Sequence, residues 1–131
     1  MAVRIQPMDK ITEAMVMDSL RISLGKIKSV RVGLGDYQEC MYGYHFTLGT
    51  DASSVNTSWC TWDPATIVRS DYCNWTEADR DTELAMNDRK MSQLLKDAKV
   101  DNVNDLIGIP VEITFAGGNV LRKWRILKEV L

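Results

Sequence analysis

The stretch Cys40–Trp62, which reads CMYGYHFTLGTDASSVNTSWCTW, decides how the rest of the chain is read. Its first part alternates strand-forming residues with others at a period of two, as in a β-strand. The polar TDASSVN segment that follows is typical of a loop. From Val55 onward the alternation returns, with Trp59 and Trp62 on opposite faces. We therefore expect a β-hairpin that holds much of the aromatic mass of the protein.

Composition places the chain among ordinary globular proteins. Of its 131 residues, 45% are hydrophobic and 26% charged, so we expect one domain over residues 1–131 with no bound cofactor. The formal net charge of −2 gives no overall attraction to nucleic acid or to a membrane surface. The opening MAVRIQPMDK lacks the apolar centre of a signal peptide, and no apolar run approaches the roughly 20 residues that span a bilayer. We expect a cytoplasmic protein with no membrane partner.

The segment before the hairpin has the least regular pattern. Residues 10–24 fit either a strand or one face of a helix. Strands are favoured because β-branched residues are frequent in residues 27–34. The SLGKIK motif at residues 23–28 predicts a turn, and the alternation of Val30, Val32 and Leu34 predicts a strand after it.

The clearest helix is expected over residues 77–98. Thr76 and Asp79 form a variant of the capping box, and acidic residues fill the first two turns, where the helix dipole favours negative charge. The apolar residues that recur on one helical face are Leu84, Met91, Leu94, Leu95 and Ala98.

A second hairpin is expected after this helix. Residues 100–107 form a short connector with one helical turn near Asn102, which Gly108 and Pro110 end. Strands are predicted over residues 111–115 and 120–127, joined by an Ala-Gly-Gly-Asn turn. This order of elements predicts an α+β fold, an antiparallel or mixed β-sheet with one long helix packed on it.

Cysteine and histidine are the residues most able to carry chemistry. His45 with Cys40, Cys60 and Cys73 offers the ligand types of a zinc site. No CxxC motif presents two ligands from one turn, and Cys40 and His45 have opposite strand parity, which argues against metal. Cys60 and His45 could also form a nucleophile pair across the hairpin, but no protease signature surrounds them. We expect no metal site and no catalytic residue.

Aromatic and basic residues form the candidate binding surface. Tyr42, Tyr44, Trp59 and Trp62 are predicted as aromatic contacts, with Arg122 and Arg125 as basic ones. Such residues bind single-stranded nucleic acid by stacking, and they are also enriched where proteins bind one another. The alternative interpretation is that the aromatic residues at period two form a core face.

A family resemblance covers most of the chain from Lys10 onward. It rests on YGYHFTLG at residues 42–49, SWCTW at residues 58–62, the long helix, and the Leu-x-Gly-x-Pro-Val element at residues 106–111. These motifs resemble a group of small proteins from tailed bacteriophages and prophages, many of which open with a strand comparable to Lys10-Ile11-Thr12. The loop departs from the group, because TDASSVNTS stands where a glycine-rich loop is usual. The resemblance implies a phage origin and a role inside the infected cell, and it implies no catalytic residues.

The expected function is that of a phage-encoded, non-enzymatic binding protein. It would act in the cytoplasm of the infected bacterial host on a host or phage protein, as an inhibitor of a defence system. The alternative is a protein that binds single-stranded nucleic acid or a small nucleotide, with nucleic acid not favoured. Homodimerisation through a free sheet edge stays open, because an unpaired edge is a template for another strand.

Overall fold

The structure is a computed structural model that describes residues 20–35, 41–63 and 76–131. The expectations for residues 10–19, for Cys40 and for Cys73 lie outside the described residues. The elements in chain order are β1 (Leu20–Gly35), β2 (Met41–Gly49), β3 (Ser54–Trp62), α2 (Glu77–Ala98), η2 (Val103–Leu106), β4 (Pro110–Ala116), β5 (Val120–Ile126) and η3 (Lys128–Val130).

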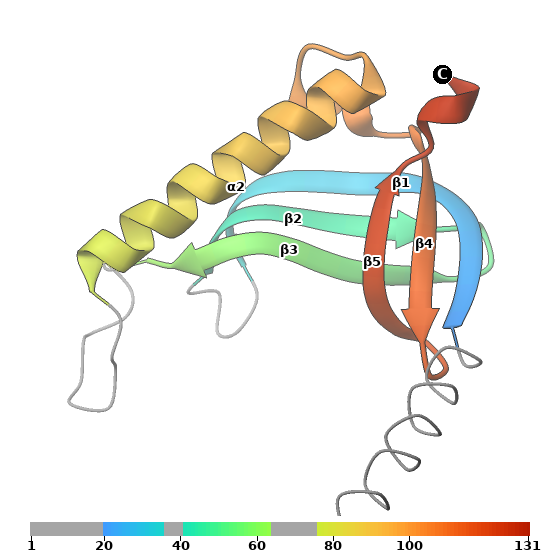
Figure 1. Ribbon diagram of the computed structural model, residues 1–131, viewed down its shortest axis with the longest axis horizontal. Coiled ribbons are helices and arrows are strands. Elements are labelled where there is room, and N and C mark those ends of the chain that lie inside the picture. Colours follow the sequence, from blue (N-terminus) through green and yellow to red (C-terminus); the bar gives the residue numbers. More distant parts are fainter. Residues whose placement is uncertain (1–19, 36–40, 64–75) are drawn as a thin grey trace, which may run out of the picture.

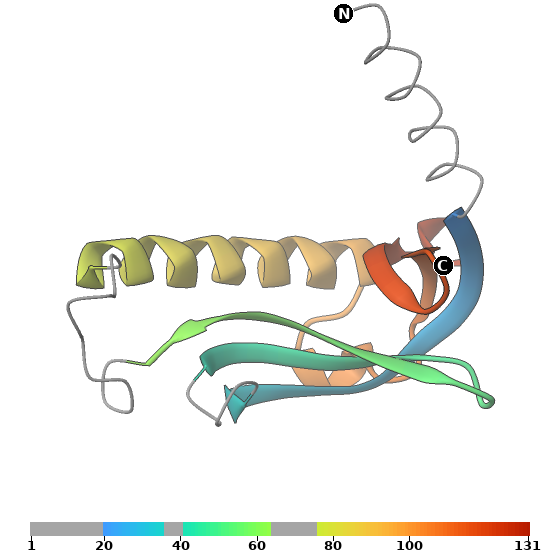
Figure 2. The ribbon, with the colours of Figure 1, turned by 90° about the horizontal axis from the view of Figure 1, so that it is seen from below.

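The strands form one antiparallel sheet in the order β3-β2-β1-β4-β5, and α2 packs on one of its faces (Figures 1 and 2). The predicted α+β class is therefore confirmed. Both predicted hairpins are present, as β2–β3 and β4–β5. The helix occupies residues 77–98 as predicted, with the reciprocal capping box between Thr76 and Asp79.

The predicted turn at residues 23–28 is wrong, because these residues lie inside β1. One part of β1, Leu20–Lys26, pairs with β4, and the other part, Lys26–Gly35, pairs with β2. A bulge between Ile27 and Ser29 interrupts the register, and bulges bend a strand. At Gly25 a Cβ atom would lie 2.7 Å from the carbonyl oxygen of Gly49, so only glycine fits this close approach. Figure 1 shows the result: β4 and β5 run across the direction of β2 and β3.

The core lies inside this bend, where three aromatic rings from different strands meet. The ring of Phe46 on β2 lies 4.9 Å from that of Trp59 on β3 and 5.1 Å from that of Trp124 on β5, measured between centroids. The two tryptophan rings stack at 5.6 Å with an interplanar angle of 16°. Aliphatic side chains from the sheet, α2 and η2 complete the buried cluster: Ile27, Leu48, Met91, Leu94, Ala98, Leu106, Val111, Ile113 and Ile126.

The bulge in β1 also decides which side chains face the core. Ile27 pairs with Leu48 and Val30 pairs with Phe46, so an odd-numbered residue before the bulge and an even-numbered residue after it face inward. Before the bulge, Ser23 lies opposite the buried Ile113, and Ile22 and Leu24 face outward, where they are 64% and 61% exposed. Consecutive side chains of a strand point to opposite faces of the sheet. The extra residue of the bulge therefore changes which parity, odd or even, faces the core.

Candidate functional site

The four aromatic residues predicted as a contact surface do not share one face. Tyr42 and Tyr44 lie opposite Thr61 and Trp59 on the helix side of the hairpin. Trp62 lies opposite Met41, which puts it on the other side of the sheet. Trp59 is half-buried and packs in the aromatic core described above. The structure therefore keeps Tyr42 near Tyr44, and it places Trp62 away from both.

Tyr44 is tied to the helix. Its phenol donates a hydrogen bond of 2.9 Å to Asp88 Oδ1 on α2. Burial, and next the hydrogen bond to Asp88, raise the pKa of Tyr44 to about 12. Both effects favour the protonated phenol, since an ionised oxygen here would lose solvent and face a carboxylate. Tyr44 thus joins β2 to α2, which is a structural contact within the protein.

The shifted pKa of Tyr44 predicts a loss of stability at high pH. An unperturbed tyrosine titrates near pH 10. Because the folded pKa is about 12, the contribution of Tyr44 is complete below pH 10 and is lost as the pH rises toward 12. Denaturation by urea at intervals from pH 9 to 12 measures this loss. The Tyr44→Phe variant has no phenol to ionise, so its free energy of unfolding is expected to fall less over the same range. Parallel curves for the two proteins would contradict the prediction.

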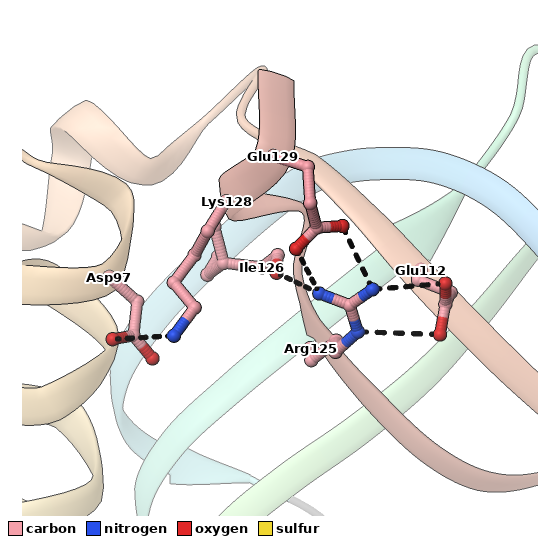
Figure 3. A network of polar contacts seen from close by, with 6 residues as sticks. All are labelled: Asp97, Glu112, Arg125, Ile126, Lys128 and Glu129. Atoms are coloured by element: carbon pink, nitrogen blue, oxygen red, sulfur yellow. Dashed lines mark hydrogen bonds and ion pairs between the residues drawn. The ribbon is translucent and has the colours of Figure 1, made fainter. Parts of the chain in front are cut away.

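Arg125 does not stand free for a phosphate. Figure 3 shows its guanidinium between the carboxylates of Glu112 on β4 and Glu129 on η3. The shortest of these contacts joins Arg125 Nη1 to Glu129 Oε1 at 2.8 Å. Hydrogen bonds from Arg125 lower the pKa of Glu129, and those two carboxylates raise the pKa of Arg125. A guanidinium that is already shared between two carboxylates has little left to offer a nucleic-acid backbone.

Neighbouring contacts tie η3 and Leu131 to α2 and its C-cap. Lys128 on η3 lies 3.9 Å from Asp97 on α2, and Lys99 Nζ donates to the carbonyl oxygen of Leu131 at 3.1 Å. Arg122, the other predicted basic contact, is exposed on β5. Arg122 and Arg125 therefore differ in role: the first is an exposed cation, and the second is a structural one.

On the face of the hairpin away from the helix, His45 has two polar contacts. Its Nε2 atom lies 2.9 Å from the carbonyl oxygen of Gly33, and its Nδ1 atom lies 2.8 Å from Ser58 Oγ. A carbonyl oxygen only accepts, so in the neutral imidazole Nε2 donates and Nδ1 accepts the proton of Ser58. The register places Cys60 opposite Gly43, so the ring nitrogens of His45 contact Ser58 and Gly33 instead of the thiol. Within the described residues, no group of three or more His, Cys, Asp or Glu side chains could hold a metal ion.

Tyr42 belongs to an exposed apolar group that the sequence did not single out. It pairs with Leu34 on β1, and Val32 pairs with Tyr44 in the same register, so the side chains share the helix-side face. Val32 is 48% exposed, and Leu34 and Tyr42 are each 40% exposed. We call Val32, Leu34 and Tyr42 the β1–β2 patch. The alternation of Val30, Val32 and Leu34 predicts a strand, but only the position of α2 decides which of these side chains stay uncovered.

Helix α2 does not cover the patch, because it lies to one side of it. The helix packs mainly on β3 and less on β2, and Figure 2 shows it above β3 with β1 farthest away. None of the helices in residues 20–35, 41–63 and 76–131 is long and apolar enough to cross a membrane.

These placements leave two regions of interest: the β1–β2 patch on the helix side, and the polar contacts of His45 on the other. Comparison of the chain with protein-family models, with curated proteins and with solved structures gave no match.

Proposed function

We propose that this protein is a non-enzymatic binding protein that engages a partner protein through the β1–β2 patch. The observation that carries the proposal is the joint exposure of Val32, Leu34 and Tyr42, at 48%, 40% and 40%, on one face of two paired strands. β-Branched, aliphatic and aromatic side chains that lie together on a surface favour burial against another protein. Tyrosine in particular is enriched in protein interfaces.

The edge of β1 supports an extended segment as the occupant. Up to Lys26 one edge of β1 pairs with β4, and the backbone of Ile27 bonds Gly108 and Ile109. Beyond Ile27, none of the described strands pairs with that edge. An unpaired edge offers backbone donors and acceptors to an incoming strand, and the side chains beside it provide specificity. The partner would add a strand along residues 28–35 and cover the patch with its own apolar side chains.

The resemblance to tailed-phage proteins supports the setting of the proposal. On that ground the partner is a host or phage protein, the compartment is the cytoplasm of the infected bacterium, and the consequence of binding is inhibition of a host defence system. A protein that inhibits by occupying a surface needs no catalytic residues.

The test compares two charge-insertion variants of β1. Val32→Asp/Leu34→Asp puts two carboxylates in the β1–β2 patch, and Ile22→Asp/Leu24→Asp puts them on the opposite face of the same strand. Each tagged protein is purified from infected cells, and the proteins recovered with it are quantified by mass spectrometry. We expect a partner that the wild type and the control variant recover equally and that the patch variant recovers about tenfold less, because a buried unpaired carboxylate is strongly unfavourable.

Circular dichroism and thermal unfolding of both variants confirm that each is folded before recovery is compared. If the patch variant is unfolded, Tyr42→Ala, which only truncates an exposed side chain, replaces it. Equal recovery by the patch variant and the control would overturn the proposal. A wild-type dimer that the patch variant converts to monomer would show that a second copy of this chain occupies the patch instead.

A further inference from the structure

One face of the sheet also borders an open cavity of about 450 Å³, where the β2–β3 turn approaches the β4–β5 turn. It is separate from the β1–β2 patch and does not depend on the proposed function. The apolar lining residues include Leu48, Val55, Ile113 and Phe115, which we call the floor. The polar lining residues include Arg21, Ser23, Ser53, Ser54 and Asn119, which we call the rim. Small-molecule sites have this composition and volumes of roughly 300–1,000 Å³.

The cavity exists because of the bulge in β1. Before the bulge, the residues that face the concave side of the sheet are Arg21, Ser23 and Gly25. Ser23 and Gly25 are too small to fill the space between the two hairpin ends. The bulky Ile22 and Leu24 are 64% and 61% exposed on the outward face, and Ile22 also borders the cavity. Without the bulge, the even-numbered residues Ile22 and Leu24 would face the core here and fill this space. With the bulge, small residues face it and the space stays open.

Arg21 is held in place at the rim. Its Nη2 atom donates to the carbonyl oxygen of Gly118 at 3.2 Å and to Asn119 Oδ1 at 3.0 Å. The guanidinium lies over the ring of Phe115, with its Cζ atom 4.9 Å from the ring centroid. Among the described residues, no acceptor bonds Nε or Nη1 of Arg21. The side chain is therefore preorganised and keeps N–H donors for an anion.

The opposite wall is a closed turn. Thr50 N donates to the carbonyl oxygen of Ser53 at 2.9 Å, and Lys28 Nζ donates to the carbonyl oxygen of Thr50 at 3.0 Å. Ser53 and Ser54 are among the residues that line this side of the cavity. Arg21 is the one charged residue among the cavity's lining residues, so the site as a whole favours a ligand with negative charge.

We propose that this cavity binds a small planar aromatic anion, a ligand that joins an aromatic ring to a phosphate or a carboxylate. The ring lies on the apolar floor beside Phe115, and the anionic group accepts hydrogen bonds from Arg21. The serine hydroxyls of the β2–β3 turn bond polar atoms at the ring edge. Nucleoside monophosphates and aromatic carboxylic acids share this chemistry, and the experiment separates them.

Four probes are titrated into the full chain by isothermal calorimetry. Adenosine 5′-monophosphate carries ring and phosphate, indole-3-acetate carries ring and carboxylate, adenosine lacks the anion, and inorganic phosphate lacks the ring. We expect at least one of the first two to bind with a Kd below about 1 mM, and about tenfold more tightly than adenosine or phosphate. The tighter of the two identifies the class of ligand. Absence of saturable binding by both, or equal binding of adenosine, would overturn the proposal.

The variants connect binding to Arg21. Arg21→Met keeps the length of the side chain and removes its donors, so the tightest probe is expected to bind about tenfold more weakly. Arg31→Met is the matched control, because Arg31 is also an exposed arginine of β1 but does not line this cavity. Unchanged affinity of Arg21→Met, or equal weakening by both variants, would contradict the site. If Arg21→Met does not fold, Asn119→Ala is expected to weaken binding in its place, because it removes one of the two acceptors that hold the guanidinium at the turn.

Discussion

Replacing Phe46 with alanine is expected to lower the free energy of unfolding by about 4 kcal/mol. The Phe46 side chain is 2% exposed, and its ring contacts those of Trp59 and Trp124 from two other strands. Removing it leaves a void between the two arms of the bent sheet. The stacked tryptophans cannot close this void without moving β5 relative to β3. Urea denaturation followed by tryptophan fluorescence measures the change.

Tyr42→Ala is the control for this prediction. Tyr42 is another aromatic residue of β2 on the same face, but it is 40% exposed. Its truncation is expected to cost about 1 kcal/mol or less, since much of the side chain is already in water. If Phe46→Ala and Tyr42→Ala cost the same, the aromatic cluster does not hold the two arms of the sheet together.

Replacing Gly43 with alanine is expected to cost about 3 kcal/mol or more, which is unusually large for the addition of one methyl group. A Cβ atom at Gly43 would overlap the carbonyl oxygen of Trp59 and lie 2.6 Å from Cys60 Cα. Both neighbours are backbone atoms of the paired strand β3, so no side-chain rotation relieves the contact. The hairpin would have to separate at this point, and the ring of Trp59 would shift with it. Thermal and urea unfolding measure the loss.

Gly118→Ala measures the cost of a positive φ without crowding, whereas Gly43 combines close backbone contacts with a φ of +157°. Gly118 has a φ of +78°, but nothing lies within 4 Å of where its Cβ would be. Alanine there pays only for the left-handed conformation, about 1–2 kcal/mol. A loss at Gly43 no larger than the loss at Gly118 would contradict the steric explanation.

Local signals predicted most elements of the fold. The capping box at Thr76 and the apolar residues of 77–98 lie in one continuous segment, so they can be recognised from the local sequence. The same holds for each hairpin, because its turn directly connects the two strands that pair. The exception is the SLGKIK motif, where Gly25 and the lysines suggest a turn. Pairing with β4 on one side and β2 on the other overrides that preference.

The candidate sites were harder to predict, for a physical reason. Tyr42, Tyr44 and Phe46 have the same parity, but their burial depends on where α2 crosses the sheet, which the alternation within β2 does not show. In β1 the bulge changes which parity points to the helix side of the sheet. Leu24 and Leu34 are both even-numbered, but they point to opposite sides. The cavity beside Arg21 follows from the same change. Pattern reading at a fixed period cannot detect an inserted residue.

The way β1 is shared has a consequence for synthesis on the ribosome. Strands β1, β2 and β3 emerge first and can pair at once, but Phe46 and Trp59 have no Trp124 to cover them until β5 has been made, more than fifty residues later. During that interval the nascent chain presents aromatic surface and an edge of β1 that still awaits β4. Nascent chains in this state are the usual substrates of chaperones. We therefore expect the yield of this protein in a cell to depend on how quickly its last two strands follow the first three.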